Sequence, residues 1–239
     1  MKRTPVKISV IMPAYNAALT IRAAIRSVLR QKGPSFELLI ADDASTDSTW
    51  GCIQKFRQDP RIRSFRFRRN RGVAAASNYL ISEARGKYLS SCDADDMLLP
   101  GNLRRLAHVL DTSPSCGVAY ADSLIVSSSR TRRMVSRSAI ETFWELLGGR
   151  FTNGGTLIRR SLVKRIGGYR TQFVFLEDCD LFVRLSEITK FYYVKGKPLY
   201  CQRKTKGSLS DQSQRKLRQV SRIILRDALK RRYGYQAQW

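Results

Sequence analysis

The stretch Lys87-Tyr-Leu-Ser-Ser-Cys-Asp-Ala-Asp-Asp-Met-Leu-Leu-Pro100 is an apolar run that ends in three carboxylates within four residues, Asp93, Asp95 and Asp96. At a strand end such carboxylates repel one another unless a cation neutralises them. Alternating carboxylates on a short turn present hard oxygens to a divalent metal, which in turn holds a diphosphate. The alternative interpretation is the acidic first turn of a helix, because Pro100 to Leu110 reads as helical. The motif alone leaves both interpretations open.

Strand and helix patterns alternate around this motif and predict an α/β fold with a mostly parallel, Rossmann-like central sheet flanked by helices. Strands are expected at 7–12, 36–41, 61–67, 87–92, 117–126, 156–159, 191–194 and 199–202, and helices at 17–31, 46–57, 73–84, 100–110, 139–147, 177–186 and 212–232. Pro13 is expected to stop the first strand, and the Ser/Arg-rich residues 127–138 to form a loop. We see no internal repeat and no low-complexity linker in the chain.

Polar clusters follow four of the expected strands, at residues 13–15, 42–43, 70–72 and 93–96. In open parallel sheets, ligands bind beyond the carboxyl ends of the strands. Four clusters at one sheet edge are hard to attribute to turns alone. The sequence therefore predicts a ligand site at this edge.

The charge balance is unusual, with 44 Lys and Arg against 19 Asp and Glu and a net charge of +25. Basic residues concentrate at 61–71, 130–137 and 215–232. This balance indicates an anionic partner, which means nucleic acid, an acidic membrane surface or a phosphate-bearing substrate. The alternative is a set of solvated basic faces without a partner.

Other features narrow the possible classes of protein. The five cysteines are widely spaced without a Cys-x-x-Cys pair, and His108 is the only histidine, which disfavours disulfide frameworks, structural zinc and Ser-His-Asp chemistry. No apolar run approaches the roughly 20 residues of a transmembrane helix, and the N-terminal run is too short for a signal peptide. No Gly-x-Gly-x-x-Gly follows the first strand, which disfavours a dinucleotide oxidoreductase. A reducing, cytoplasmic setting is expected.

Five motifs follow one another along the chain: Ile8-Ser-Val-Ile-Met-Pro-Ala-Tyr-Asn16, Asp42-Asp-Ala-Ser-Thr-Asp47, Asn70-Arg-Gly72, Asp93-Ala-Asp-Asp96 and Glu177-Asp-Cys-Asp-Leu181. Their order and spacing resemble glycosyltransferase family 2, the inverting nucleotide-sugar transferases of GT-A fold. The resemblance extends from about residue 6 to about residue 210. A single motif of this kind is weak, whereas five in order are highly specific.

The resemblance implies a nucleotide pocket built from the first three motifs. Pro13, Tyr15 and Asn16 would line it, with the Tyr15 ring free to stack on a base. Asp43 or its neighbour Asp42 would accept the imide N–H of uracil. The alternative for this pair is an Asx-type turn before the next helix, with Ser45 or Asp47 as the cap.

Arg71 and Gly72 form the third part of this pocket. Arg71 would meet phosphate or base, and Gly72 permits a close approach of the backbone to the ligand. The alternative for Arg71 is one more member of an arginine-rich segment.

The resemblance further implies that Asp95 coordinates Mg²⁺ or Mn²⁺, with Asp93 towards the ribose and the metal and Asp96 as a possible second ligand. The ion would bridge the donor diphosphate and stabilise the leaving nucleoside diphosphate.

Asp178 resembles the catalytic base of the family, and Glu177 would orient the acceptor or support the site. The alternative is that Asp178 caps the helix that begins there, and one residue can do both. Residues 152–156 fall where the family shapes the sugar and acceptor side, although a plain turn explains Gly154 and Gly155 as well.

One departure from the family concerns the segment Arg203-Lys-Thr-Lys-Gly-Ser-Leu-Ser210. Many relatives carry a histidine that assists the metal where this chain has Thr205. Lys204 and Lys206 can instead neutralise the diphosphate, which leaves room for reduced metal dependence.

Taken together, the motifs predict a catalytic domain over residues 1–210, with a nucleotide-binding half to about residue 100, and a basic helical extension over 211–239. The expected activity is transfer of a sugar from a nucleotide-sugar donor, UDP-linked, to a hydroxyl of a glycan or lipid-linked acceptor in cell-surface polysaccharide biosynthesis. The extension either lies on anionic lipid or packs against the domain. A basic nucleic-acid-binding module and a catalytically silent transferase-like scaffold are the alternatives.

Overall fold

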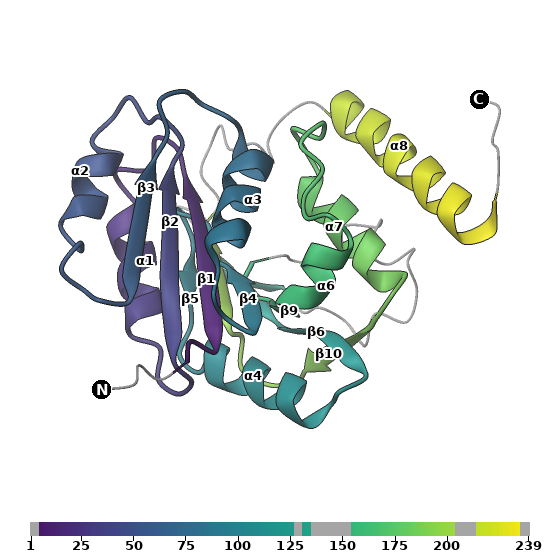
Figure 1. The fold of residues 1–239 in the computed structure, drawn as a ribbon, viewed down its shortest axis with the longest axis horizontal. Coiled ribbons are helices and arrows are strands. Elements are labelled where there is room, and N and C mark those ends of the chain that lie inside the picture. Colours follow the sequence, from purple (N-terminus) through teal and green to yellow (C-terminus); the bar gives the residue numbers. More distant parts are fainter. Residues whose placement is uncertain (1–4, 127–130, 135–153, 204–213, 235–239) are drawn as a thin grey trace.

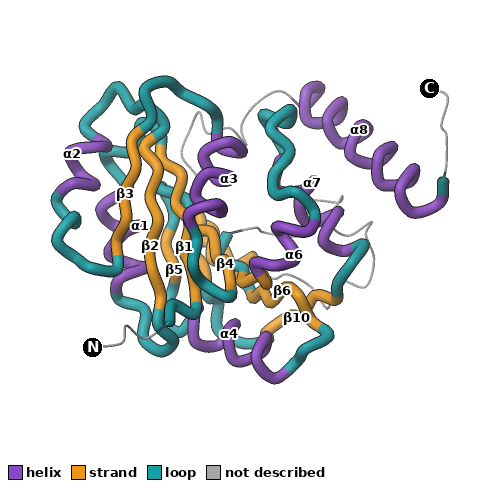
Figure 2. The backbone as a smooth tube through the Cα atoms, viewed as in Figure 1, coloured by secondary structure: helices purple, strands orange, loops and turns teal. Residues whose placement is uncertain are grey.

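A computed structural model describes residues 5–126, 131–134, 154–203 and 214–234. Its centre is a seven-stranded sheet with the order β10-β6-β9-β4-β1-β2-β3, covered by helices on both faces (Figures 1 and 2). The strands of this sheet are β1 (Ile8–Ala14), β2 (Phe36–Asp42), β3 (Ile62–Arg66), β4 (Tyr88–Ser91), β6 (Cys116–Ala121), β9 (Leu157–Arg159) and β10 (Lys190–Val194). The expected α/β fold with a mostly parallel sheet is confirmed.

The β1 strand is the centre of the core because it pairs in parallel with both β2 and β4. Its alternate side chains face opposite sides of the sheet. One side packs on α1 (Ile21–Leu29), α2 (Thr49–Gln54) and α4 (Asn102–Thr112). The other packs on α3 (Val73–Glu83), α6 (Arg160–Arg165), α7 (Glu177–Ser186) and α8 (Gln214–Tyr233). Burial on both faces explains why β1 and β2 read as continuous apolar runs.

Pro13 does not end the first strand, contrary to expectation. It lies within β1 opposite Ala41 of β2. Pairing with β4 covers only Ile8 to Ile11. The missing N–H of Pro13 therefore falls beyond the end of that ladder and costs no hydrogen bond with β4.

A second, four-stranded sheet has the order β5-β11-β7-β8, with β5 at Met97–Leu98, β7 at Ser123–Val126, β8 at Thr131–Met134 and β11 at Tyr200–Arg203. The single strand expected at 117–126 is in fact two strands, because the chain leaves the large sheet at Asp122 and enters the small one. Part of the expected loop at 127–138 is β8, and the helix expected at 139–147 lies outside the described residues.

The second half also contains two features that the sequence patterns did not predict. The β9 strand runs antiparallel between β4 and β6. The short α6 helix follows β9 directly. All five cysteines are free.

The α8 helix packs against the domain instead of projecting from it. Ile224 and Ala228 are fully buried in the core that α7 shares. Arg170 ties the two helices together, since it donates to Asp180 of α7 and, at 2.8 Å, to Asp227 of α8. Asp180 is fully buried and also accepts from Arg184 at 2.8 Å. This ion network joins the start of α7 to α8.

Removal of the central charge of this network should weaken the fold. We expect Asp180→Asn to lower the free energy of unfolding by about 3 kcal/mol, because it leaves the buried Arg184 guanidinium without its carboxylate and takes one of two carboxylates from Arg170. Chemical denaturation measures the change. The control is Glu187→Gln, which breaks the more exposed pair with Arg231 and should cost less than about 1 kcal/mol. Equal losses in the two variants would contradict the special role of Asp180.

Candidate active site

The loops that follow β1 and β2 are bonded to each other at the carboxyl edge of the sheet. The amide of Asn16 donates to Ser45 Oγ, and the Asn16 side-chain oxygen accepts the N–H of Thr46 at 2.9 Å. Asp47 accepts from the backbone of Ala18 and of Thr49. Asn16 and Asp47 therefore use their side chains to fix the loops, and Asp47 serves as a cap for the start of α2.

Asp42 and Asp43, which follow β2, are both buried. Asp42 Oδ1 accepts the N–H of Ser45 at 3.1 Å, and Asp42 Oδ2 lies 3.3 Å from Arg66 Nε. The Asx-type turn is thus observed for Asp42. Asp43 accepts the backbone N–H groups of Arg71 and Gly72 at 2.8 and 2.9 Å, one on each carboxylate oxygen. Asp43 brings the loop after β3 to the loop after β2, and each of its oxygens retains a lone pair for a ligand.

The other residues expected around a nucleotide line the outside of these loops. The Tyr15 ring is half exposed, and Pro13 is partly covered. The Arg71 guanidinium lies over the Phe67 ring, 5.1 Å from its centroid, and remains exposed. Gly72 has a φ of 82° with open space where a Cβ would stand. The three loops therefore meet at one sheet edge, with an aromatic face and a cation directed to solvent.

The acidic turn follows β4 at the same edge. Carboxylate oxygens of Asp93, Asp95 and Asp96 all lie within 4.8 Å of one another. Asp93 is exposed, Asp95 is partly covered and Asp96 is buried. Both oxygens of Asp96 have protein partners: Oδ2 accepts from the Tyr200 hydroxyl at 2.8 Å, and Oδ1 accepts from the Arg203 backbone N–H at 2.7 Å. Asp96 thus anchors the turn to β11, whereas no such bonds hold the carboxylates of Asp93 and Asp95 within the described residues.

Tyr200 is the part of the site that the sequence motifs did not indicate. Its ring lies against Gly154 and Gly155, where a Cβ on Gly154 would stand only 2.0 Å from a ring carbon. Its hydroxyl donates to Asp96 and accepts the N–H of Asp93 at 3.4 Å. The sequence predicts that Gly154 and Gly155 either shape the sugar and acceptor side or form a plain turn. The contact observed for this pair is with the Tyr200 ring of the protein itself. Glycine is required there because any side chain would displace Tyr200.

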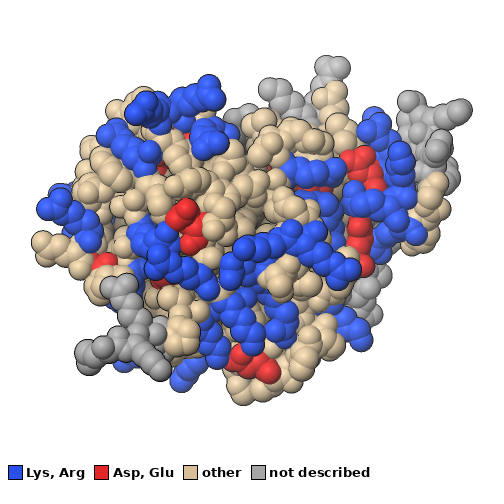
Figure 3. Space-filling model, in the orientation of Figure 1, with Lys and Arg blue, Asp and Glu red and all other residues tan. Residues whose placement is uncertain are grey.

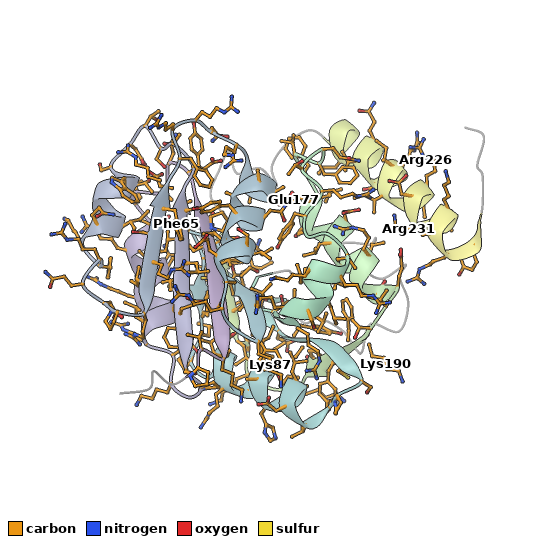
Figure 4. All side chains as sticks on the ribbon, in the orientation of Figure 1. Phe65, Lys87, Glu177, Lys190, Arg226 and Arg231 are labelled. Carbon is orange, nitrogen blue, oxygen red and sulfur yellow. The ribbon has the colours of Figure 1, made fainter. Side chains whose placement is uncertain are left out.

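The remaining two carboxylates stand at the start of α7. Leu176, immediately before this helix, has a φ of 58°, a left-handed conformation that is unusual for leucine and costs about 1–2 kcal/mol. Asp178 Oδ1 accepts the N–H of Cys179 at 2.7 Å inside the first turn of α7. The N-cap is Leu176, so Asp178 does not cap the helix, contrary to the alternative expectation. Figure 4 shows Glu177 between α3 and α7.

Electrostatics link the α7 start to the acidic turn. Asp93 reaches solvent, yet the protein atoms around its carboxyl withhold water from it. This desolvation raises the pKa of Asp93 well above its usual range, and the charges of Asp96, Asp95, Asp178 and Glu177 raise it further. Desolvation and the charge of Asp95 raise the pKa of Asp96 to about 7. The five carboxylates therefore form one cluster of like charges.

The two carboxylates of α7 are perturbed in the same direction. Desolvation and the neighbouring Asp178 raise the pKa of Glu177 to about 8. Desolvation also raises the pKa of Asp178, against the hydrogen bond from Cys179. A pair of shifted carboxylates beside a cluster of hard oxygen ligands is suited to proton transfer next to a bound cation.

The donor set fits a divalent metal. Asp93 and Asp95 offer hard oxygens that no other described residue occupies with a hydrogen bond, and their mutual repulsion would be relieved by a cation. Desolvation raises the pKa of Asp95, and among the described residues the charge of Arg203 opposes this rise. The departure from the family pattern predicted at Thr205, with Lys204 and Lys206 beside it, lies outside the described residues.

Solved structures with this architecture bind nucleotide sugars. TarS of S. aureus in complex with UDP-GlcNAc superposes with a TM-score of 0.78 at 18% identity and covers 97% of this chain and 74% of that chain. The mannosyltransferase PcManGT of Pyrobaculum calidifontis, in complex with GDP-Man and Mn²⁺, superposes with a TM-score of 0.69 at 18% identity, over 100% of this chain and 68% of that chain. The fold is therefore the GT-A fold.

Curated relatives include the succinoglycan biosynthesis protein ExoO of Rhizobium meliloti (strain 1021), 34% identical over 64% of this chain and 43% of its own length. Another is WfaP of Escherichia coli, a UDP-Glc:α-D-GlcNAc-diphosphoundecaprenol β-1,3-glucosyltransferase, 35% identical over 44% of this chain and 41% of its own length. The chain spans between 26% and 67% of the length of the first three curated relatives. The sequence model described as Glycosyl transferase family 2 matches residues 9–167, and the chain belongs to that family.

Proposed function

We propose that this glycosyltransferase moves a sugar from a UDP-linked donor to a hydroxyl of a glycan or lipid-linked acceptor, with inversion at the anomeric carbon. The observation that carries the proposal is the single cluster of five carboxylates beside the loops of β1, β2 and β3. Three of the carboxylates belong to the acidic turn and two to the start of α7. This division matches the two needs of the reaction, which are charge neutralisation at the diphosphate and a base at the acceptor.

The donor side is assigned to the loops of the nucleotide-binding half. Tyr15 would stack on the base, and the free lone pairs of Asp43 would accept the imide N–H of uracil. Arg71 would meet a phosphate or the base, with Gly72 allowing close approach. A UDP donor is supported by the complex of TarS with UDP-GlcNAc and by the UDP-Glc of the name of WfaP. Pro13 and Asn16 shape the pocket wall, and Asp42 acts through its buried turn.

A divalent cation, Mg²⁺ or Mn²⁺, held by Asp95 and Asp93 would neutralise the diphosphate and favour departure of UDP. The ion bound with GDP-Man in PcManGT supports this choice of metal. Asp96 is better placed to hold the turn than to serve as a primary ligand, since both of its oxygens already accept hydrogen bonds.

Asp178 is assigned as the base. A proton shared with Glu177 rests better on Glu177, because the N–H of Cys179 stabilises the Asp178 carboxylate. Asp178 would take the acceptor hydroxyl proton while the hydroxyl oxygen bonds to the anomeric carbon. The bond from that carbon to the diphosphate breaks, and its electron pair leaves with UDP. Attack from the face opposite the leaving group gives inversion.

The names of two relatives support the acceptor and the setting that we propose. WfaP acts on a diphosphoundecaprenol-linked sugar, and ExoO is named for succinoglycan biosynthesis. We assign this chain to cell-surface polysaccharide assembly at the cytoplasmic side of a membrane. None of the described helices is long and apolar enough to cross a bilayer. The proposal divides the chain into a catalytic domain over 1–210 and a basic extension over 211–239.

The metal assignment predicts that nucleotide binding depends on Asp95. UDP at about 100 times its Kd should add about 2.7 kcal/mol of stability when Mn²⁺ is present, which raises the Tm of a chain of this size by about 5–10 °C. EDTA should remove most of this shift, and Asp95→Ala should make the shifts with Mn²⁺ and with EDTA equal. The control is Asp59→Ala, which removes a carboxylate paired with Arg61 outside the acidic cluster. An Asp95→Ala protein that keeps the metal-dependent shift would refute the assignment.

The base assignment predicts a kinetic loss without a loss of structure. Asp178→Asn keeps the shape of the side chain, and its amide oxygen can still accept the N–H of Cys179. It should lower the rate of sugar transfer by about 10²–10⁴-fold, with the Tm and the UDP shift unchanged. Release of UDP from donor and acceptor measures the rate. Transfer at near-parental rate would move the role of base elsewhere, with Glu177 as the next candidate.

The raised pKa of Glu177 predicts a pH dependence of stability in EDTA. The folded protein holds this proton up to a pKa of about 8, against an ordinary value of 4.5. As the pH rises through this window the unfolded chain releases the proton first, so the free energy of unfolding must fall. The Tm should therefore decrease from pH 5 to pH 8, and Glu177→Gln should make the decrease smaller. An unchanged slope in this variant would show that Glu177 does not carry the effect.

A further inference from the structure

The two sides of α8 carry different kinds of side chain. Ile224 and Ala228 are fully buried, and Val220 and Leu225 pack beside them on the core. Two basic residues also turn towards the domain: Arg231 pairs with Glu187 at 2.9 Å, and Arg232 donates to Ser186 Oγ at 3.0 Å. The inner side of the helix is therefore fully used by the fold.

The outer side is a stripe of cations, Arg218, Arg222, Arg226 and Lys230, each four residues after the last. Residues at this spacing lie on one face of a helix. All four are exposed. Within the described part of the chain only Arg226 has an acidic neighbour, Asp227 at 3.8 Å, and Asp227 is itself committed to Arg170 at 2.8 Å. Figure 4 shows Arg226 on the outer side of α8 and Arg231 on the side towards the domain. Figure 3 shows that Lys and Arg predominate over Asp and Glu on the side of the molecule that faces the viewer.

Exposed apolar side chains accompany the stripe. Ile223 is 37% exposed and Tyr233 is 72% exposed. Tyr233 follows Arg226 by seven residues, which places it on the same face of the helix. A ring with a polar tip and long cationic chains with apolar stems are the side chains that settle at a bilayer surface.

We propose that this outer face of α8, with Arg218, Arg222, Arg226, Lys230, Ile223 and Tyr233, binds the surface of an anionic phospholipid bilayer. The charge of the stripe is complementary to acidic headgroups, and each basic residue near such a surface strengthens binding by roughly five-fold. The inference deepens the proposed function, because it names the surface that holds the enzyme near a lipid-linked acceptor. The binding itself requires neither donor nor acceptor.

The position of α8 gives this binding a consequence for the site. Arg170 connects α8 through Asp227 to Asp180, in the same helix turn as Glu177 and Asp178. A bilayer held on the outer face of α8 thus lies one helix away from the proposed base. The helix is joined to the catalytic core by ion pairs and buried side chains.

A nucleic acid is the other polyanion that a basic helix can meet. The described aromatic residue on the stripe is Tyr233 alone, whereas single-stranded nucleic acid is bound through a series of stacked rings. The stripe is a single straight row on a helix whose opposite face is buried, which suits a flat surface. The observations therefore favour the bilayer, and nucleic-acid binding becomes an outcome of the test.

The test is flotation of the full chain with vesicles of phosphatidylcholine alone or of phosphatidylcholine and phosphatidylglycerol in equal parts. The protein should float only with the anionic vesicles, and added salt should release it. The triple variant R218Q/R222Q/R226Q should bind these vesicles roughly 100-fold more weakly. Its Tm and its UDP-dependent Tm shift should equal those of the parent.

A matched control comes from α1 and its C-cap, which also carry three exposed arginines at the same spacing, Arg22, Arg26 and Arg30. The variant R22Q/R26Q/R30Q removes the same charge, from +25 to +22, and should keep nearly all of the vesicle binding. Equal losses in both triple variants would show attraction by net charge alone and overturn the proposal. It would also be overturned if the α8 variant lost affinity for a fluorescent oligonucleotide but kept its affinity for vesicles. Failure of sugar transfer with intact flotation would count against the proposed function only.

Discussion

The structure depends on keeping five carboxylates together at one end of a sheet. Repulsion between carboxylates this close together destabilises the folded state, and a small number of hydrogen bonds offset part of that free energy. The Tyr200 hydroxyl and the Arg203 amide hold Asp96. The Cys179 amide holds Asp178. Asp93 and Asp95 are left with their repulsion, which only an added positive charge can relieve. The electrostatic repulsion that destabilises the folded chain is also what would attract a cation and its diphosphate.

The same half of the molecule shows how a helix from the end of the chain becomes part of the site's support. Asp180 lies in the first turn of α7 together with the partly buried carboxylates of Glu177 and Asp178, and it is buried among arginines. Arg170 connects this network to α8 through its ion pair with Asp227. The direction of the first turn of α7 therefore depends on contacts made by a segment that carries no recognisable motif. Packing against the domain and contact with lipid were the two alternatives expected for this extension, and they do not exclude each other. The inner face of α8 packs on the domain, and the outer face remains available for lipid.

Sequence patterns predicted the strands of the first hundred residues well, because these strands are buried on both faces and are followed by loops with distinctive polar side chains. The bounds of α7 were also predicted correctly, because acidic residues mark its first turn and its apolar residues keep a helical spacing. The β9 strand was located, but its antiparallel direction was not, since an apolar run of three residues carries no sign of direction. Tyr200 was missed because its role arises from contacts with Gly154 and Asp96, which no spacing in the sequence reveals. The backbone amide of Arg203 is invisible to any pattern of residue types.

The contact between Tyr200 and Asp96 also has a consequence for the order in which the molecule is built. These two residues are 104 positions apart in the chain. On the ribosome the acidic turn emerges long before the ring and the amide that hold it, and β4 waits for β9 before it gains its second neighbour. Contacts over such sequence distances form late. The nascent chain thus carries its carboxylates in water, fully hydrated and without a fixed geometry, until its last third has been synthesised.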